Sequence, residues 1–172
     1  GITNKQMIIT NNRNNAVNDY INKTCRYIIN YCLNNNIGNL VIGYNETLQK
    51  DINLGRANNQ NFVNIPVGNI KEKLEYLCKM YDINFTKQEE SYTSKASFFD
   101  NDEIPKYNPN APKEYAFSGK RVKRGLYVTR AGYKLNADVN GAFNILKKSS
   151  VVCLNALYGR GEVDTPVRIR IA

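Results

Sequence analysis

The sequence predicts an α/β fold with parallel neighbouring strands. Residues 40–44 form a short apolar run typical of a buried strand, a helical pattern begins at Pro66, and residues 83–89 alternate apolar and polar side chains as a second strand does. A strand, a helix and a strand of these lengths make a βαβ unit, whose two strands lie parallel in one sheet. A chain of 172 residues with 42% hydrophobic residues is long enough for one packed domain, and no second hydrophobic core is expected.

Three amphipathic helices are expected to flank these strands. The first spans residues 16–33 and ends at the Asn-rich residues 34–36. The second begins at Pro66, and the third spans residues 136–148 with Asn136 as its N-cap. Apolar residues three and four positions apart define the faces: Val17, Tyr20, Ile21, Cys25, Ile28 and Cys32 for the first helix, Ile70, Leu74, Leu77, Cys78 and Tyr81 for the second, and Val139, Phe143 and Leu146, or else Ala142, Ile145 and Leu146, for the third.

The sequence contains no His, which rules out several classes of enzyme. It excludes Ser-His-Asp triads, Cys-His dyads, HExxH metalloproteases and Cys2His2 zinc fingers. Cys25, Cys32 and Cys78 occupy apolar positions in helical patterns, so they are expected to be buried free thiols. With Cys153 they form no CxxC pair, so no zinc ribbon is expected. The absence of a signal peptide and of a run of 18 apolar residues indicates a cytoplasmic protein with no membrane partner.

The net charge of +9 indicates a polyanionic partner, with nucleic acid as the first candidate. Residues 45–64 are expected to form a polar loop, and residues 91–119 a long surface excursion. Gly125 and Gly132 bracket a predicted hairpin within residues 120–134, a stretch without a single acid. Its cations are expected either to contact phosphates or to be an ordinary solvated loop: Lys120, Arg121, Lys123, Arg124, Arg130 and Lys134.

Three carboxylates are candidates for chemistry that needs no His. Glu89 and Glu90 stand at the carboxyl end of the second strand, where sites form in open α/β sheets, and Asp138 lies in the first turn of the third helix. Phosphodiester hydrolysis without His commonly relies on Mg²⁺ held by carboxylates. Successive strand residues point to opposite faces, so only one of Glu89 and Glu90 is expected to enter such a site. The alternative is solvated surface charge for the two Glu residues and a helix-dipole role for Asp138.

Two segments carry a resemblance to a known family. ESYTSKAS (residues 90–97) followed by NADVNGAFNI (136–145) resembles the C-terminal half of the OrfB/TnpB family, and VIGYNETLQKDINLGRANNQNFVNIP (41–66) resembles one of its subfamilies. Members of this family are transposon-encoded, RNA-guided DNA endonucleases related to type V CRISPR effectors. The similarity covers roughly residues 13–148. It implies a partial RNase H-like (RuvC-like) domain over residues 1–172, with residues 91–135 a basic insertion at the place of the family's zinc ribbon.

The resemblance also implies a divalent-metal site and its partners. The family uses Asp, Glu and Asp with Mg²⁺ or Mn²⁺, and acts on DNA with a guide RNA. Its last Asp corresponds to Asp138. Gly43 stands where the usual strand Glu is expected, so a relocated Glu is expected to replace it. Glu90 is the favoured replacement because it immediately precedes the SYTS segment, and Glu89 is the fallback.

Two departures from the family pattern limit these expectations. Nothing before Arg13 resembles the strand that carries the first catalytic Asp, so a C-terminal portion of a longer protein is expected. The ribbon cysteines are also replaced, with Ser97 near the first ligand position and Val128 and Ala131 near the second pair, so no zinc is expected. The alternatives to a nuclease are an inactive relative that only binds nucleic acid and a truncated remnant.

Overall fold

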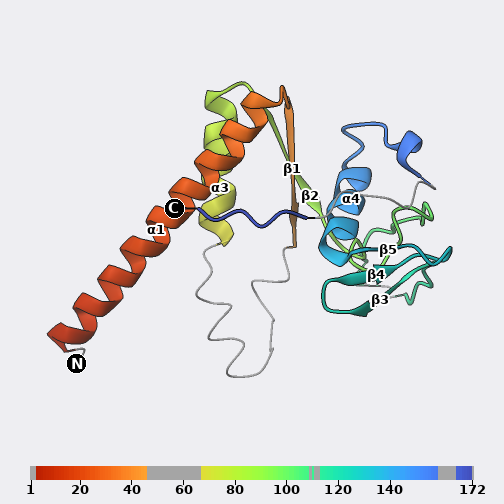
Figure 1. Ribbon diagram of the computed structural model, residues 1–172, viewed down its shortest axis with the longest axis horizontal. Helices are drawn as coiled ribbons and strands as arrows, with labels where there is room; N and C mark the ends of the chain where they lie inside the picture. The colour runs from red at the N-terminus through yellow and green to blue at the C-terminus, as the bar shows by residue number, and fades with distance from the viewer. Residues whose placement is uncertain (1–2, 46–66, 109, 111–112, 159–165, 172) are drawn as a thin grey trace. The chain divides into compact units, whose positions relative to one another are not determined.

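The structure is a computed structural model that describes residues 3–45, 67–108, 110, 113–158 and 166–171. The described residues divide into two compact units, the first within Gly1–Leu40, Asn53–Phe85 and Arg168–Ala172 and the second within Val41–Ile52 and Thr86–Val167. Figure 1 shows the elements, which are α1 (Asn4–Asn34), β1 (Asn39–Tyr44), α3 (Val67–Met80), β2 (Asn84–Glu89), β3 (Lys120–Lys123), β4 (Leu126–Val128), β5 (Lys134–Asn136), α4 (Ala137–Ser149) and the 3-10 helix η2 (Asn155–Leu157).

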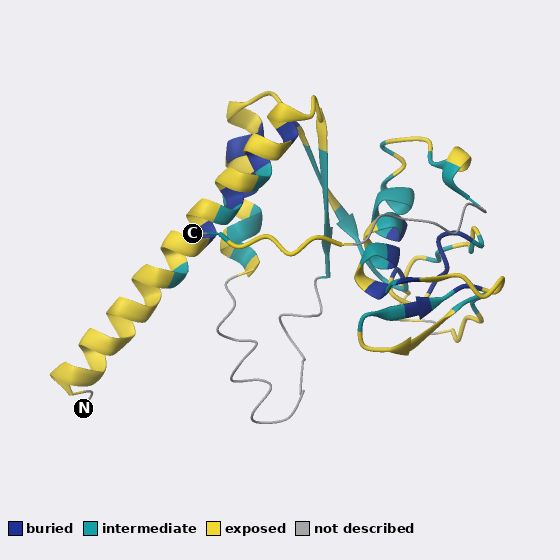
Figure 2. Cartoon of the chain, in the orientation of Figure 1, coloured by how far each residue is buried: buried dark blue, intermediate teal, exposed yellow. Residues whose placement is uncertain are grey.

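The first unit is held together by α1 and α3, which pack side by side (Figure 1). Helix α1 begins at Asn4 rather than near residue 16, because Thr3 and Gln6 form a capping box that satisfies free N–H groups at its start. Its first turns are exposed (Figure 2), so the apolar stripe alone does not mark its true beginning. The predicted faces are largely confirmed, but Tyr20 and Tyr81 are exposed and Ile29 replaces Ile28 in the core. The buried set is Ile21, Cys25, Ile29, Cys32, Leu74, Leu77, Cys78 and Ile83.

The predicted βαβ unit is confirmed. Strands β1 and β2 are hydrogen-bonded neighbours and run parallel. The Asn84 N–H donates to the Gly38 carbonyl oxygen at 2.9 Å, and the Glu90 N–H donates to the Tyr44 carbonyl oxygen at 3.2 Å. The pairing therefore advances in the same direction along both strands and ends at Glu90. The predicted polar loop over residues 45–64 lies almost entirely outside the described residues.

The second unit contains a three-stranded antiparallel sheet, in the order β3-β4-β5, next to α4 (Figure 1). The two turns of this sheet contain Gly125 and Gly132, whose φ angles of +78° and +87° are accessible to Gly at little cost. The predicted hairpin is therefore confirmed. The third strand was not anticipated, because residues 134–136 are few and mostly polar.

An aromatic core stabilises the second unit, so the expectation of a single core is wrong. Phe98 and Tyr127 are completely buried, and the Phe98 ring stacks on Phe143 with centroids 4.7 Å apart. The residues of this core are dispersed over the non-periodic excursion and the short strands, which is why hydrophobic periodicity does not reveal it. Within the part of the chain that the structure describes, no helix is long and apolar enough to cross a membrane.

The buried face of α4 is polar, contrary to the predicted apolar stripes. Asn140 and Asn144 are fully buried, whereas Ala142 is exposed and Phe143 only partly buried. The N-cap is as predicted, because the Asn136 side chain accepts hydrogen bonds from the Asp138 and Val139 N–H groups. A helix that buries amides must bind polar groups with them.

Candidate functional site

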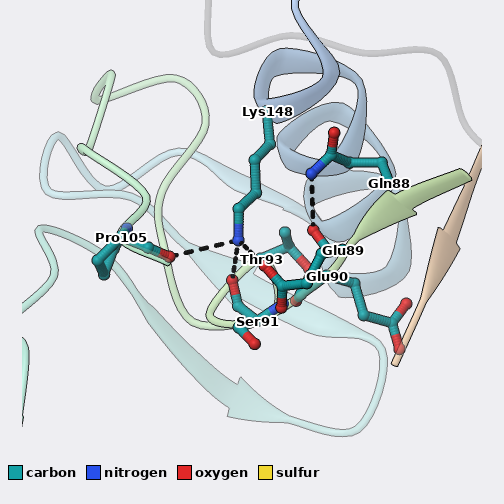
Figure 3. Close-up of polar contacts among 7 residues, drawn as sticks. All are labelled: Gln88, Glu89, Glu90, Ser91, Thr93, Pro105 and Lys148. Carbon is teal, nitrogen blue, oxygen red and sulfur yellow. Dashed lines mark hydrogen bonds and ion pairs between the residues drawn. The ribbon is translucent and has the colours of Figure 1, made fainter. Parts of the chain in front are cut away.

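Glu89 and Glu90 point in different directions at the end of β2 (Figure 3). The Glu89 carboxylate lies 2.5 Å from the Lys148 ammonium and accepts a hydrogen bond of 2.5 Å from the Ser91 N–H. Burial raises the pKa of Glu89, but the hydrogen bonds from Lys148 and Ser91 and the charge of Lys148 outweigh it, so the pKa lies below its usual value. Glu89 is therefore an ionised partner of Lys148 and is occupied by that role.

Glu90 occupies the space above Gly43, the position where the resemblance places the family's Glu. A Cβ atom on Gly43 would lie 2.5 Å from the Glu90 Oε2 atom and 2.7 Å from the Ile145 Cδ1 atom. Heavy atoms cannot approach so closely, so a side chain at position 43 and the present position of Glu90 exclude each other. No hydrogen-bond partner of the Glu90 carboxylate is found among the described residues, so this carboxylate is available for a ligand.

Asp138 lies on the same helix as Ile145 and two turns before it, which is about 10 Å along the axis. Seven residues make nearly two full turns, so the two residues share one face of α4. The Asp138 side chain is 82% exposed, and its Oδ1 atom lies 3.5 Å from an Arg121 nitrogen. An ion pair this exposed contributes little stability, so the contact with Arg121 does not prevent the Asp138 carboxylate from binding a ligand.

The structure thus places Glu90 near Ile145, on the face of α4 that also carries Asp138, and directs Glu89 to Lys148 of the same helix. Both are oxygen ligands of the kind that Mg²⁺ and Mn²⁺ prefer. Among the described residues, no group of three or more His, Cys, Asp or Glu side chains is placed to hold a metal ion. The donor set therefore fits a divalent cation in type and supplies part of a coordination sphere.

Buried amides of α4 join the two segments that carry the family resemblance. The Asn140 side chain accepts from the Phe98 N–H at 3.1 Å and donates to the Ala96 carbonyl oxygen at 2.8 Å. The Asn144 side chain donates to the carbonyl oxygens of Thr93 and Ala96 at 2.9 and 2.7 Å. Apolar periodicity does not predict this role, although two Asn residues four positions apart in a helix are a signal for it.

Replacing Asn140 by Ala is expected to destabilise the protein by about 1–3 kcal/mol, the cost of one unmet buried polar group. The change leaves the buried Phe98 N–H without its side-chain partner, whereas the Ala96 carbonyl oxygen keeps its hydrogen bond from Asn144. Urea unfolding of the two proteins measures the difference. The exposed Asn155 provides the control, since Asn155→Ala should change the free energy of unfolding by less than about 0.5 kcal/mol. Equal stability of the Asn140 variant and the parent would contradict the prediction.

Carboxylates organise the excursion at the place where the resemblance puts a zinc ribbon. The Asp100 carboxylate accepts from the Ser97 hydroxyl at 2.5 Å and from the Arg130 N–H at 2.9 Å. The Asp102 carboxylate accepts from the N–H groups of Ser97 and Ser118 at 2.8 and 2.9 Å. Segments far apart in sequence are therefore held by hydrogen bonds to two Asp side chains.

The buried Tyr127 lies beside this carboxylate cluster. Burial raises the pKa of Tyr127 to about 12, and the nearby charges of Asp102 and Asp100 add to the effect. Its hydroxyl donates to the Lys95 carbonyl oxygen at 2.8 Å.

All six predicted cations are exposed on or beside the antiparallel sheet. In the strand register Lys120 lies opposite Val128, and Val128 lies opposite Lys134, so these two lysines project from the same face. Arg121 approaches Asp138, and Arg130 donates to the Ser118 hydroxyl at 2.8 Å. The structure therefore places one cation of β3, Arg121, beside one of the candidate carboxylates.

The three helical cysteines are buried free thiols, as predicted, and Cys153 is free and exposed. Burial raises the pKa of Cys25 and Cys32, and it raises the pKa of Cys78 to about 11. A thiol with such a pKa is neutral at physiological pH and is a poor nucleophile. These residues pack the first unit rather than contribute chemistry.

Part of the chain matches a known protein family. Residues 68–145, which contain Glu89, Glu90 and Asp138, match the family described as Cas12f1-like, TNB domain. This match and the structural likeness described next support a TnpB/OrfB-like family member, the family that the sequence resembles. No curated protein matches the sequence.

The chain is also similar to a solved structure, the cryo-EM structure of the Cas12f1-sgRNA-target DNA complex. The TM-score is 0.57 and the sequence identity is 21%. The similarity covers 83% of this chain and 36% of that one, so the chain spans about a third of the length of its structural relative. The chain has a mixed α/β structure with a parallel two-stranded sheet and helices, and this fold is similar to that of Cas12f1.

Proposed function

We propose that this TnpB/OrfB-like chain is the C-terminal, RuvC-like portion of an RNA-guided, divalent-metal-dependent DNA endonuclease encoded by a transposon. In this proposal the parallel strands and α4 belong to an RNase H-like domain that acts on DNA in the cytoplasm, at the nucleoid. The family match and the likeness to a complex of Cas12f1 with guide RNA and target DNA support this reading.

The proposal rests mainly on the positions of Gly43 and Glu90. The family's Glu is missing from β1, yet a carboxylate from β2 fills the space next to the glycine that replaces it. A glycine is needed there for Glu90 to approach, since even a methyl group would collide with its Oε2 atom. A catalytic Glu relocated to position 90 needs a glycine at position 43, whereas a solvated surface Glu needs no glycine opposite it.

Glu90 and Asp138 would hold the metal ion. A divalent ion activates a water molecule and stabilises the leaving oxygen in phosphodiester hydrolysis. The chain contributes two negatively charged oxygen ligands on one side of α4. Glu89 contributes no ligand in this proposal, because its carboxylate is paired with Lys148.

The exposed cations of residues 120–134 would hold the phosphates of the strand that enters the site. Lys120 and Lys134 share a face of the sheet, and Arg121 lies beside Asp138. Phosphate contacts from Lys and Arg supply most of the sequence-independent affinity for nucleic acid. A nuclease-inactive relative that only binds nucleic acid is the second candidate, and the two-carboxylate donor set among the described residues favours it.

Replacing Asp138 by Ala in the full-length, guide-loaded protein is expected to abolish DNA cleavage and to leave DNA binding intact. The side chain is 82% exposed and the helix start is capped by Asn136, so its removal should alter stability by about 1 kcal/mol or less. Cleavage of labelled target DNA and a parallel binding assay measure the two effects.

Asp19→Ala is the matched control, because Asp19 is also an exposed helical Asp paired with a cation, Lys23 at 2.9 Å. This variant should cut DNA at the parent rate. Undiminished cutting by the Asp138 variant would instead support the second candidate or a site elsewhere.

A further inference from the structure

Lys148 is a nearly buried cation that has no role in the proposed chemistry. Its side chain is only 7% exposed. The ammonium donates to the Glu89 carboxylate at 2.5 Å, to the Ser91 carbonyl oxygen at 3.1 Å and to the Pro105 carbonyl oxygen at 3.3 Å (Figure 3). An ammonium has three donors, so these contacts use all of them. Such complete pairing is what a buried cation needs.

Two of the three contacts of Lys148 fall on the residues that flank Glu90. Lys148 holds Glu89 through its carboxylate and Ser91 through its main chain. The main chain of Glu90 itself is fixed by its N–H bond to Tyr44 and by the Thr93 N–H and hydroxyl, which donate to its carbonyl oxygen at 3.2 and 2.8 Å. Hydrogen bonds therefore fix the main chain of Glu90 and both of its neighbours in the sequence.

The direction of the Glu90 side chain follows from this arrangement. Successive side chains of a strand point to opposite faces. Because Lys148 binds Glu89 on one side, Glu90 is directed to the other side (Figure 3). There its carboxylate lies next to Gly43. Lys148 also keeps Glu89 from competing as a ligand, since the Glu89 carboxylate is occupied by the ammonium and by the Ser91 N–H.

We infer that Lys148 is a positioning residue for the metal ligand Glu90, acting through Glu89 and Ser91. The inference rests on the proposed function, since it assumes that Glu90 binds the metal ion. Groups that hold a metal ligand in place typically affect metal affinity or activity by about 10- to 100-fold. A lysine that only stabilises the fold would change thermal stability without changing metal affinity in the folded protein.

The neighbouring lysine provides a matched control. Lys147 lies beside Lys148 in the last turn of α4, and its ammonium donates to the Asn101 side chain and the Asp102 carbonyl oxygen, both at 2.7 Å. Lys147→Met therefore removes a lysine that anchors the same excursion but does not contact residues 89–91. Lys148→Met removes the contacts around Glu90, and Lys148→Arg retains a cation with several donors.

The test measures Mn²⁺ affinity of the full-length, guide-loaded protein by electron paramagnetic resonance, together with thermal stability and the Mg²⁺ dependence of cleavage. We expect Lys148→Met to weaken Mn²⁺ binding by about 10- to 100-fold. DNA cleavage by this variant should be reduced at low Mg²⁺ and restored at high Mg²⁺. Lys148→Arg should recover most of the affinity, and Lys147→Met should match the parent. Hydrogen exchange of residues 89–91 should rise in Lys148→Met alone.

Three outcomes separate this inference from the proposed function. A folded Lys148→Met variant with parent Mn²⁺ affinity overturns the inference, provided that Glu90→Gln removes Mn²⁺ binding. If Glu90→Gln leaves Mn²⁺ binding and cleavage unchanged, the proposed function fails and the inference with it. If Lys148→Met does not fold, the Mn²⁺ affinity of Glu89→Gln tests the inference instead. This variant weakens the same contacts without leaving a cavity. Parent affinity in Glu89→Gln then overturns the inference.

Discussion

Replacing Glu90 by Gln is expected to reduce DNA cleavage about a thousandfold or more in the full-length, guide-loaded protein. Glutamine keeps the size of the side chain above Gly43 but removes the charge that a divalent cation requires. Metal ions contribute several kcal/mol to transition-state stabilisation, and each 1.36 kcal/mol is a factor of ten in rate. The measurement is a single-turnover cleavage rate at saturating guide and target, with DNA affinity determined in parallel.

Two further variants make this result specific. Glu103→Gln removes an exposed carboxylate of the excursion and should leave the rate unchanged. Glu89→Gln should reduce the rate much less than Glu90→Gln, and added Mg²⁺ should offset the loss, because Glu89 holds Lys148 and not the metal ion. A large loss in Glu89→Gln with a normal rate in Glu90→Gln would show instead that Glu89 is the ligand.

Replacing Gly43 by Ala is expected to lower the cleavage rate by about 10- to 100-fold although no carboxylate is removed. The new methyl group would lie 2.5 Å from the Glu90 Oε2 atom and 2.7 Å from the Ile145 Cδ1 atom, so the Glu90 carboxylate must move. Both contacts are to the ends of side chains that can rotate, so the loss of stability should stay within about 1–3 kcal/mol. Cleavage rates and thermal melting of the same preparations distinguish the two effects.

The double variant Gly43→Glu with Glu90→Gly tests whether the carboxylate can be returned to β1. It removes the side chain that fills the space at position 43 and places a Glu where the resemblance expects one. We expect it to cut DNA faster than either single variant, which is a non-additive result typical of residues in contact. Additive losses in the two positions would indicate that Gly43 and Glu90 do not share one function.

The choice between the two adjacent Glu residues shows the limit of the sequence. Strand alternation predicts that only one of Glu89 and Glu90 enters the site, and in the structure the two side chains point in different directions (Figure 3). Alternation alone does not say which one, because it depends on what lies on each side of the strand. Lys148 follows Glu89 by 59 residues and draws it away, and Gly43 leaves the space that Glu90 fills.

The buried face of α4 shows a second limit. The sequence favoured apolar residues for that face, yet Asn140 and Asn144 are its most buried polar members. A buried amide is favourable only where it finds hydrogen-bond partners. Here the partners are the main-chain groups of Thr93, Ala96 and Phe98. Those partners come from a non-periodic segment whose conformation no local pattern predicts.

The sequence by itself determined the helices, the parallel βαβ unit, the basic segment and the family, because periodicity, capping residues and motif spacing are local properties of the chain. Only the tertiary structure decided the second core, the polar packing of α4 and the different surroundings of Glu89 and Glu90. These features depend on contacts between residues that are distant in sequence. The energy of a buried charge or amide is set by such partners and not by its neighbours in the chain.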